Sequence, residues 1–445
     1  MMWNPWRIAW LAIPFLGLGW HASAQQPAQV QLTLKEAIRL ALKSNLAVKV
    51  AGTQVDEMEG TEIRRMAALL PHANGDTLAS LQNRNLSVEG ISVPGFPTVV
   101  GPFAYYDFRF SAQQELVDRQ SYHNWKASEK SEKAAKLDYQ DTRDLVIRQA
   151  AGFYLDAESA AAEVEAAESR VVTSQALEKL ARDQHDQGLA TAVDLLRAQV
   201  QLARDRQNLL VARNAYETSL LTLARFLGLS PGTSIELGEK LQFHRVEVPG
   251  AEDALQMALK TRSDYHSLLA QRESLDEQEK ALHARYLPTL SINGDYGAIG
   301  RNFGSMTMTG EIQGTLSVTL FDRDRKGEEK ERESQVQRLN AQIDDLVRGI
   351  EQDLRKAVLD LHTSEEQVTV AEAAFDLARR ELALAQDRFR NGVTDNIEVV
   401  TAQSSLASAQ DDHIAALARH ADAQVALARA LGATESIYET YLGDK

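Results

Sequence analysis

The chain has 445 residues, no cysteine and a formal net charge of −15. An acidic balance of this size argues against nucleic acid as a partner. The missing cysteines exclude disulfide frameworks, thiol catalysis and cysteine-ligated metal sites.

The first 24 residues have the composition of a secretory signal. Arg7 precedes an apolar run over 8–20, and small residues at 22–24 provide a cleavage site after Ala24. The run is too short to span a bilayer, and the alternative is an uncleaved membrane anchor. No cysteine follows the site, so no acylated N-terminus is expected. The sequence therefore predicts an exported protein, and no later segment is apolar enough for a transmembrane helix.

The segment 389–407 has an earlier copy 204 positions upstream. Gly188 matches Gly392, and Asp194 matches Glu398. In both copies one helical pattern stops at the glycine and another begins directly after it, as happens where a tight turn joins two antiparallel helices. The sequence therefore contains two long helical hairpins, and we expect their tips to form the moving, partner-binding end of a tube.

Each repeat also contains a predicted pair of strands. A helical segment stops at a Leu-Pro pair, at 70–71 and again at 287–288, because proline ends the helix and forces an extended exit. Apolar and polar residues then alternate, as at Tyr106, Phe108 and Phe110, which predicts strands with one apolar and one polar face. A half-buried sheet in a soluble protein would show the same alternation. The first pair is longer by an insertion around 91–102, which we expect at an exposed loop tip.

The segments 119–187 and 323–390 are helical and nearly free of glycine and proline. A helix of this length is roughly 100 Å long. In each repeat the opening helix and the return helix, placed end to end, are about as long as the long helix. Alanine is frequent in the seams, where it allows close helix packing. His413 and His420 fall on such a seam and are interpreted as polar seam positions rather than ligands.

These observations divide the chain into two repeats between a signal and a tail. The first repeat, 25–231, has an opening helix at 35–69, strands within 71–118, a long helix at 119–187, a tip at 188 and a return helix at 189–227. A mid-height linker follows at 232–250. The second repeat, 251–432, has an opening helix at 251–286, strands within 288–322, a long helix at 323–390, a tip at 391–393 and a return helix at 394–431. The tail is 433–445.

The predicted fold class is mainly α with a small β part. Four strands cannot close a barrel, and two chains would give eight strands with a filled interior. Three chains would give a 12-stranded barrel with an open lumen, continued by an α-helical tunnel. The sequence therefore favours a homotrimer with four strands per chain.

The doubled elements resemble the TolC-like outer-membrane efflux family. The resemblance rests on the opening residues 32–42, the two Leu-Pro strand starts, the Leu-Phe-Asp strand exit at 320–322 and the two tips, and it covers the mature chain. It implies a channel in the outer membrane whose helical part lies in the periplasm. It also implies a periplasmic adaptor and an inner-membrane transporter of the RND, metal-efflux or ABC type as partners.

The resemblance further implies a gate near the tips. By position, Asp194 and Glu398 match acidic gate sites and Phe389 matches an aromatic one. Thr394 stands where well-known members have a clamping arginine, and Thr401 where they have a second ring acid. Three copies of Glu398 would then form one cation-favouring ring. The alternative reading is that the two acids simply cap or charge the first turn of the following helix.

The tip residues are the predicted docking surface for the adaptor: Gly188, Leu189, Gly392 and Val393. Each glycine is also expected to terminate a helix. The leading functional interpretation is a passive export duct for drugs or ions. The alternatives are the outer component of a type I protein-secretion system and, with less support, a periplasmic coiled-coil scaffold without a pore.

No catalytic motif stands out in the sequence, and neither enzyme activity nor a cofactor is expected. Asp322 and Asp324 resemble part of a metal loop, but the neighbouring basic residues favour a solvated strand exit. Met306 and Met308 are interpreted as residues of a flexible loop rather than as a soft-metal site.

Overall fold

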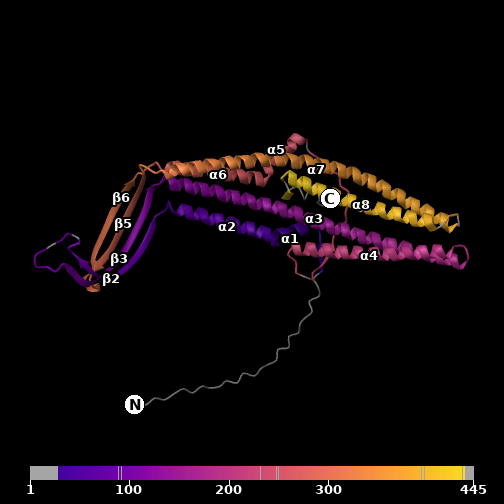
Figure 1. Ribbon diagram of the computed structural model, residues 1–445, viewed down its shortest axis with the longest axis horizontal. Helices are drawn as coiled ribbons and strands as arrows, with labels where there is room; N and C mark the ends of the chain where they lie inside the picture. The colour runs from indigo at the N-terminus through magenta and orange to yellow at the C-terminus, as the bar shows by residue number, and fades with distance from the viewer. Residues whose placement is uncertain are drawn as a thin grey trace, which may run out of the picture.

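The protein is a long rod with a small sheet at one end. The computed structural model describes residues 29–435 except 89, 92, 231, 247, 249, 392, 395 and 433. For residues 29, 30 and 396 it describes the backbone but not the side chain. Ala24, Gly392 and most of the tail 433–445 therefore lie outside the described residues. Figure 1 shows the sheet at one end, the helices running away from it, and two hairpin tips at the far end.

Two long helices form the axis of the rod. Helix α3 (Arg119–Asp186) has 68 residues and α7 (Asp324–Arg390) has 67. Over the half next to the sheet they are accompanied by α2 (Leu46–Ala67) and α6 (Ser263–Ala284). Over the other half they pack against α4 (Ala192–Phe226) and α8 (Asn396–Ala430). No described helix is long and apolar enough to cross a membrane.

Each opening helix is interrupted at the same place in its repeat. The predicted segment 35–69 is divided into α1 (Leu34–Ser44) and α2, and the predicted segment 251–286 into α5 (Ala251–Thr261) and α6. The breaks lie at Asn45 and Arg262, whose extended ψ angles of 136° and 118° end the first helix. Asn45 then caps α2 by accepting a hydrogen bond from the Ala47 amide at 2.8 Å. The helical period continues across the break, so the pattern of apolar residues does not reveal it.

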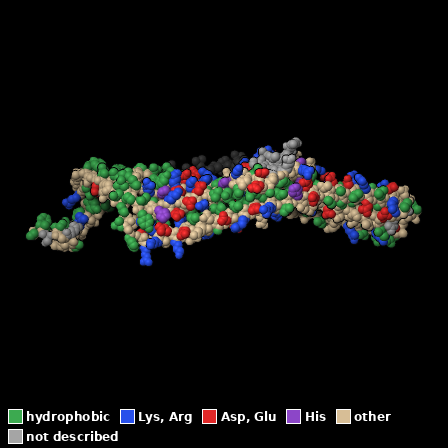
Figure 2. Space-filling model, turned by 90° about the horizontal axis from the view of Figure 1, so that it is seen from above, with side chains coloured by type: hydrophobic (Ala, Val, Ile, Leu, Met, Phe, Trp, Pro, Cys, Tyr) green, Lys and Arg blue, Asp and Glu red, His purple; other side chains and the backbone are tan. Residues whose placement is uncertain are grey.

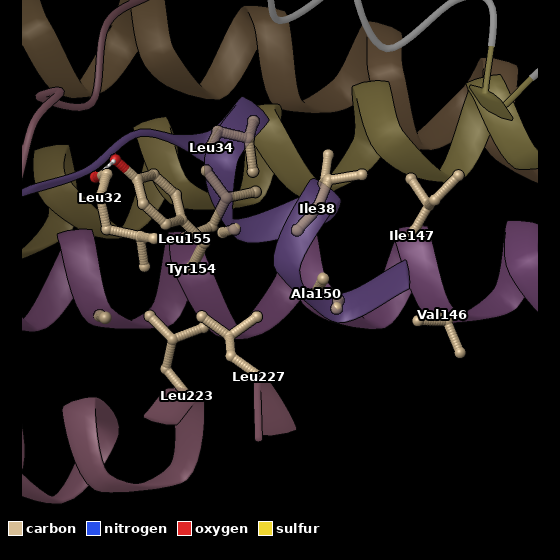
Figure 3. Packing of buried hydrophobic residues seen from close by; sticks show 14 of the residues in the cluster. Leu32, Leu34, Ile38, Val146, Ile147, Ala150, Tyr154, Leu155, Leu223 and Leu227 are labelled. Carbon is tan, nitrogen blue, oxygen red and sulfur yellow. Dashed lines mark hydrogen bonds between the residues drawn. The ribbon is translucent and has the colours of Figure 1, made fainter. Parts of the chain in front are cut away.

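A short parallel strand pair lies at mid-height. Strand β1 (Gln29–Leu32) pairs with β4 (Ser234–Leu237), which falls inside the predicted linker 232–250. The Tyr154 hydroxyl donates a hydrogen bond to the Leu32 carbonyl at 3.1 Å, which fastens β1 to α3. Figure 3 shows the surrounding core, where α1, α3 and the end of α4 meet. Its labelled residues are Leu32, Leu34, Ile38, Val146, Ile147, Ala150, Tyr154, Leu155, Leu223 and Leu227.

Four antiparallel strands form the sheet in the order β2-β3-β5-β6. Their bounds are β2 (His72–Asn85), β3 (Val99–Val117), β5 (Thr289–Gly300) and β6 (Thr307–Ser317), and a 3₁₀ turn, η1 (Phe303–Ser305), precedes β6. The strands β2 and β6 are its edges. Hydrophobic side chains gather over the sheet end in Figure 2, and charged side chains are spread along the shaft.

The two faces of the sheet differ in chemistry. One row across the four strands reads Gly75, Phe110, Tyr296 and Gly310. A Cβ added at Gly75 would lie 3.4 Å from the Phe110 ring, and one at Gly310 would lie 2.9 Å from the Tyr296 ring, so the glycines leave space for the aromatic rings. The Phe110 side chain is 76% exposed in the single chain.

On the opposite face Arg109 bridges two acids. Its guanidinium lies 3.1 Å from Asp107 and 2.5 Å from Asp295. A charged face behind an aromatic face is the arrangement expected when one side of a sheet contacts an apolar medium and the other contacts water. The predicted alternation at Tyr106, Phe108 and Phe110 therefore corresponds to a real division of the sheet.

Candidate functional site

The first tip is a helix stop built on Gly188. Its amide donates to the His185 carbonyl at 2.9 Å, and the Leu189 amide donates to the Gln184 carbonyl at 2.8 Å. These two bonds define a Schellman motif, which needs a left-handed residue after the helix end, and Gly188 has φ +74°. The motif turns the chain sharply and leaves the Leu189 side chain 75% exposed.

The second tip uses the same long-range bond. The Val393 amide donates to the Arg388 carbonyl at 2.9 Å, which is the bond made by Leu189 in the first copy. Asn391 adds a side-chain bond from Nδ2 to the Asp387 carbonyl at 2.9 Å. The Val393 side chain is 66% exposed. Both turns therefore share this backbone bond and present an apolar side chain to the solvent.

More apolar side chains continue this surface along the first turns of the return helices. We call the group the tip surface, and it consists of Leu189, Val193, Leu196, Val393 and Ile397, each between 47% and 75% exposed. Exposed apolar residues gathered on one surface are typical of a protein-binding site. Gly392, predicted to belong to this surface, lies outside the described residues.

Asp194 is engaged within its own helix end. Its carboxylate accepts from the Thr191 amide at 3.1 Å and the Thr191 hydroxyl at 2.6 Å, while the Thr191 hydroxyl accepts from the Asp194 amide at 3.3 Å. This reciprocal pair is a capping box at the start of α4. Arg197 lies 3.6 Å from the same carboxylate. The contacts match the reading of Asp194 as a cap.

Glu398 makes different contacts from Asp194 although the two are equivalent in the repeats. Its carboxylate accepts a hydrogen bond from the Thr394 hydroxyl and lies 3.5 Å from Arg388 Nε. Arg388 belongs to α7 and Glu398 to α8, so the ion pair crosses the tip. Thr394 therefore supports the acid with a hydroxyl rather than a charge. Arg388, six residues before Thr394 and on the other side of the tip, supplies the cation, and the sequence does not reveal this pairing because the resemblance places the arginine at 394.

Phe389 lies inside the helical hairpin rather than at its surface. It is 4% exposed and belongs to a core cluster contributed by α3, α7 and α8. The other buried members of this cluster are Leu177, Leu382, Ala385, Val399 and Ala402. The Phe389 carbonyl also accepts a bond from the Gln184 amide group at 3.4 Å, which links the two tips. The ring thereby holds α3 against the second hairpin directly behind the Arg388–Glu398 pair.

A buried polar cluster joins three helices further along the shaft. Ser174 on α3 donates to the Asp205 carboxylate on α4, and the Gln403 amide on α8 donates to the Ser174 hydroxyl at 3.4 Å. Gln201 donates to the other Asp205 oxygen at 3.1 Å. Asp205 is 6% exposed and Ser174 is 2% exposed. The repeated Ala-Gln pair at 402–403 was visible in the sequence, but Asp205 stands among charged residues of α4 and gave no signal.

The seam histidines and the strand exit have structural partners. The His420 Nδ1 lies 3.1 Å from the Ser364 hydroxyl and its Nε2 lies 2.9 Å from the His244 carbonyl, and His413 stacks on Phe375. Asp322 accepts from the Asp324 amide at 3.1 Å. Among the described residues no group of three or more His, Cys, Asp or Glu side chains is arranged to hold a metal ion.

The duplicated architecture has a counterpart among known families. The family model described as "Outer membrane efflux protein" matches two segments of the chain, residues 37–229 and 254–433. This chain belongs to the outer membrane efflux protein family. The resemblance found in the sequence is thereby confirmed, and so is the predicted location in the outer membrane.

Individual relatives agree with the family match. The probable efflux pump outer membrane protein TtgC of Pseudomonas putida is 22% identical over 430 residues, covering 93% of this chain and 84% of TtgC. The pyoverdine export outer membrane protein OpmQ of the same species is 22% identical over 406 residues, covering 90% of this chain and 85% of OpmQ. The structure of VceC from Vibrio cholerae superimposes with a TM-score of 0.78 at 18% identity, covering 90% of this chain and 96% of VceC.

These matches support the predicted fold class and the coarse function. The solved relatives are TolC-like channels, so the helical tunnel part with a small strand part is confirmed as the architecture. The family is one of outer-membrane efflux channels of efflux pumps, and not of enzymes.

Proposed function

We propose that the protein is the passive outer-membrane duct of a tripartite efflux system that exports small molecules, either drugs or ions. The tip surface carries this proposal, because exposed apolar side chains stand beside the two helix turns at the end of the rod farthest from the sheet. A periplasmic adaptor would bind there and connect the duct to an inner-membrane transporter. The similarity to TtgC, an efflux pump outer membrane protein, and to OpmQ, a pyoverdine export outer membrane protein, supports this role.

The duct itself would be a homotrimer. The sheet of one chain has two edges, β2 and β6, and an aromatic face that is largely exposed. Unpaired edges and a broad apolar face are both unfavourable in a lone chain, because they expose backbone donors and apolar area to water. Pairing β6 of one copy with β2 of the next removes every edge, and three copies leave an open lumen.

We further propose that the Arg388–Glu398 pair, with Thr394 and the Phe389 core behind it, holds the periplasmic end in its closed state. In this arrangement Glu398 contributes the charge that faces passing ions. Asp194 contributes to the rigidity of the first tip through its capping box. A bound adaptor would open the end by pulling the two arms of the second hairpin apart.

The docking proposal can be tested with unique thiols, because the natural chain has no cysteine. Leu189→Cys and Val393→Cys place a thiol on each tip, and Leu70→Cys places one at the sheet end, where the side chain is 49% exposed. A short photoactivatable cross-linker should join the tip variants to one periplasmic protein of adaptor size in intact cells. Equal capture of that protein by Leu70→Cys, or its absence from both tip variants in cells that still export, would contradict the proposal.

The pore itself is tested separately from docking. Purified trimers in planar bilayers should show single-channel conductance, whereas a periplasmic scaffold would show none. A pore that passes ions but is needed in cells only for secretion of a protein substrate would instead indicate the type I secretion role.

A further inference from the structure

A polar cavity of about 350 Å³ lies between four helices near the sheet. It is lined from α2, α3, α6 and α7, close to the junction of shaft and sheet seen in Figure 1. The lining includes three arginines, Arg65, Arg285 and Arg332, but only one carboxylate, Glu328. This excess of positive charge stands out in a chain whose formal net charge is −15.

Only one of the three guanidinium groups is neutralised within the cavity. Arg285 Nη1 lies 2.8 Å from the Glu328 carboxylate. Arg332 Nη1 donates to the side-chain oxygens of Gln278 at 2.6 Å and Gln335 at 2.7 Å, which are neutral acceptors. The Arg332 charge is therefore oriented by amides but not balanced by an acid.

Several donors that line the cavity have no hydrogen-bond acceptor among the described residues. The Nε atom of Arg332 is buried without a hydrogen bond. Arg65 makes no ion pair or hydrogen bond with any side chain that the structure describes, and the same holds for the Asn124 amide group, although both line the cavity. Of these donors only Arg332 Nε is buried, and a buried donor without an acceptor costs about 1–3 kcal/mol, so a ligand that supplies an oxygen acceptor would be stabilised here.

From this cavity we infer an oxyanion-binding site formed by Arg65, Arg332 and Asn124. A phosphate or carboxylate group matches it, because guanidinium groups bind such planar or tetrahedral oxygens with two parallel bonds and Arg is preferred for this recognition. The Arg285–Glu328 pair fixes the wall of the site and limits its net charge. The group can be carried by free inorganic phosphate or by the headgroup of a phospholipid, and the inference does not depend on which small molecules are exported.

The first test measures inorganic phosphate binding to the purified full-length protein by isothermal titration calorimetry in chloride buffer. The variants are Arg65→Gln and the double variant Arg65→Gln/Arg332→Gln. The control is Arg64→Gln, which removes a neighbouring charge on α2 that does not line the cavity. The double variant should bind phosphate about tenfold or more weakly than the natural protein, as expected when charge-assisted bonds are lost, whereas Arg64→Gln should bind as before.

The second test uses native mass spectrometry of the same proteins after incubation with phosphatidylglycerol. Loss of bound lipid in the double variant alone would identify the headgroup as the source of the anion, even if free phosphate binds weakly. Phosphate binding without any effect on lipid would identify the free anion. If neither ligand distinguishes the double variant from Arg64→Gln, the inference is wrong. Because the Arg65 side chain is exposed, Arg65→Gln alone keeps the test valid should the Arg332 change impair folding.

Discussion

Arg388 and Glu398 face each other across the second tip, with Nε of one 3.5 Å from Oε1 of the other. The Arg388 side chain is 55% exposed and that of Glu398 39%, so water screens the pair. Exposed pairs of this kind contribute about 0.2–1 kcal/mol. A contact that weak suits a gate, because a binding partner can break it at little cost.

Replacing Arg388 by glutamine should therefore loosen the closed end. We expect Arg388→Gln to raise the mean single-channel conductance or the open probability of reconstituted trimers severalfold, with little change in thermal stability. Arg390→Gln is the matched control, because this neighbouring arginine has no ion pair with a described residue. Equal conductance changes in both variants would show that overall charge, rather than the pair, controls the opening.

The two equivalent acids should differ in their effect on ion selectivity. Glu398→Gln removes the proposed charge at the constriction and should shift the reversal potential in a salt gradient away from cation preference. Asp194→Asn removes a negative charge from the first turn of α4, so it should cost about 0.3–1 kcal/mol of stability and leave the reversal potential unchanged. Unaltered selectivity in Glu398→Gln would remove the basis for an acidic ring at this residue.

The Ser174–Asp205 bond should be worth more than a surface contact because both groups are buried. Ser174→Ala removes a donor to the buried Asp205 carboxylate and should lower the free energy of unfolding by about 1–3 kcal/mol. Chemical denaturation followed by circular dichroism measures this change. Ser169→Ala on the exposed side of α3 should be nearly neutral, and a similar loss in both variants would mean that the buried cluster has no special role.

Glu158 should make the stability of the shaft depend on pH. It is 6% exposed, and burial, followed by repulsion from Glu239, raises its pKa from 4.5 to about 7. Between these two values the folded chain holds a proton that the unfolded chain has released, so stability falls as the pH rises through this window. Glu158→Gln should melt at a higher temperature than the natural protein at pH 8 and at the same temperature at pH 4.

The exposed Glu217→Gln on α4 provides the comparison for this measurement. It should show no such pH-dependent difference from the natural protein. A Glu158→Gln variant that gains the same stability at both pH values would indicate better packing rather than the loss of a buried charge.

The face assignment of the sheet gives a prediction about assembly. Phe110→Lys places a charge in the aromatic row and should cost about 2–4 kcal/mol if this face contacts lipid. Ser111→Lys places the same charge on the opposite face and should be tolerated. Heat-resistant trimers on gels of outer-membrane fractions measure the outcome. Normal trimers with Phe110→Lys would place the aromatic face away from lipid.

Much of this architecture follows from periodicity and repetition in the sequence. The long helices 119–187 and 323–390 were predicted to within about one residue at each end, because caps, glycines and prolines mark those ends. The breaks at Asn45 and Arg262 were not predicted, since one extended residue does not disturb a helical pattern of apolar positions. The strand pair of β1 and β4 was also missed, because its two four-residue segments lie about two hundred positions apart and carry no local signal.

In the candidate site, too, local features could be predicted from the sequence and contacts between helices could not. Turn chemistry located Gly188, Leu189 and Val393 correctly at a tip, because a helix stop is a local property. The partners of Glu398 and Asp205 depend on how separate helices pack. The sequence alone does not show which residues of two helices come into contact. Arg388 in particular is one of two arginines in the last turn of α7, and only the fold shows which of them meets Glu398.

The pairing of β1 with β4 has a consequence for the order in which the chain folds. Gln29 is aligned with Ser234, so strand β1 cannot pair until the whole first helical hairpin has been synthesised. Contacts between such distant residues close late, because the entropy of a long loop must be overcome first. The first repeat therefore cannot be completed from its N-terminus onward. Its first strand can be paired only by a segment that follows the return helix α4.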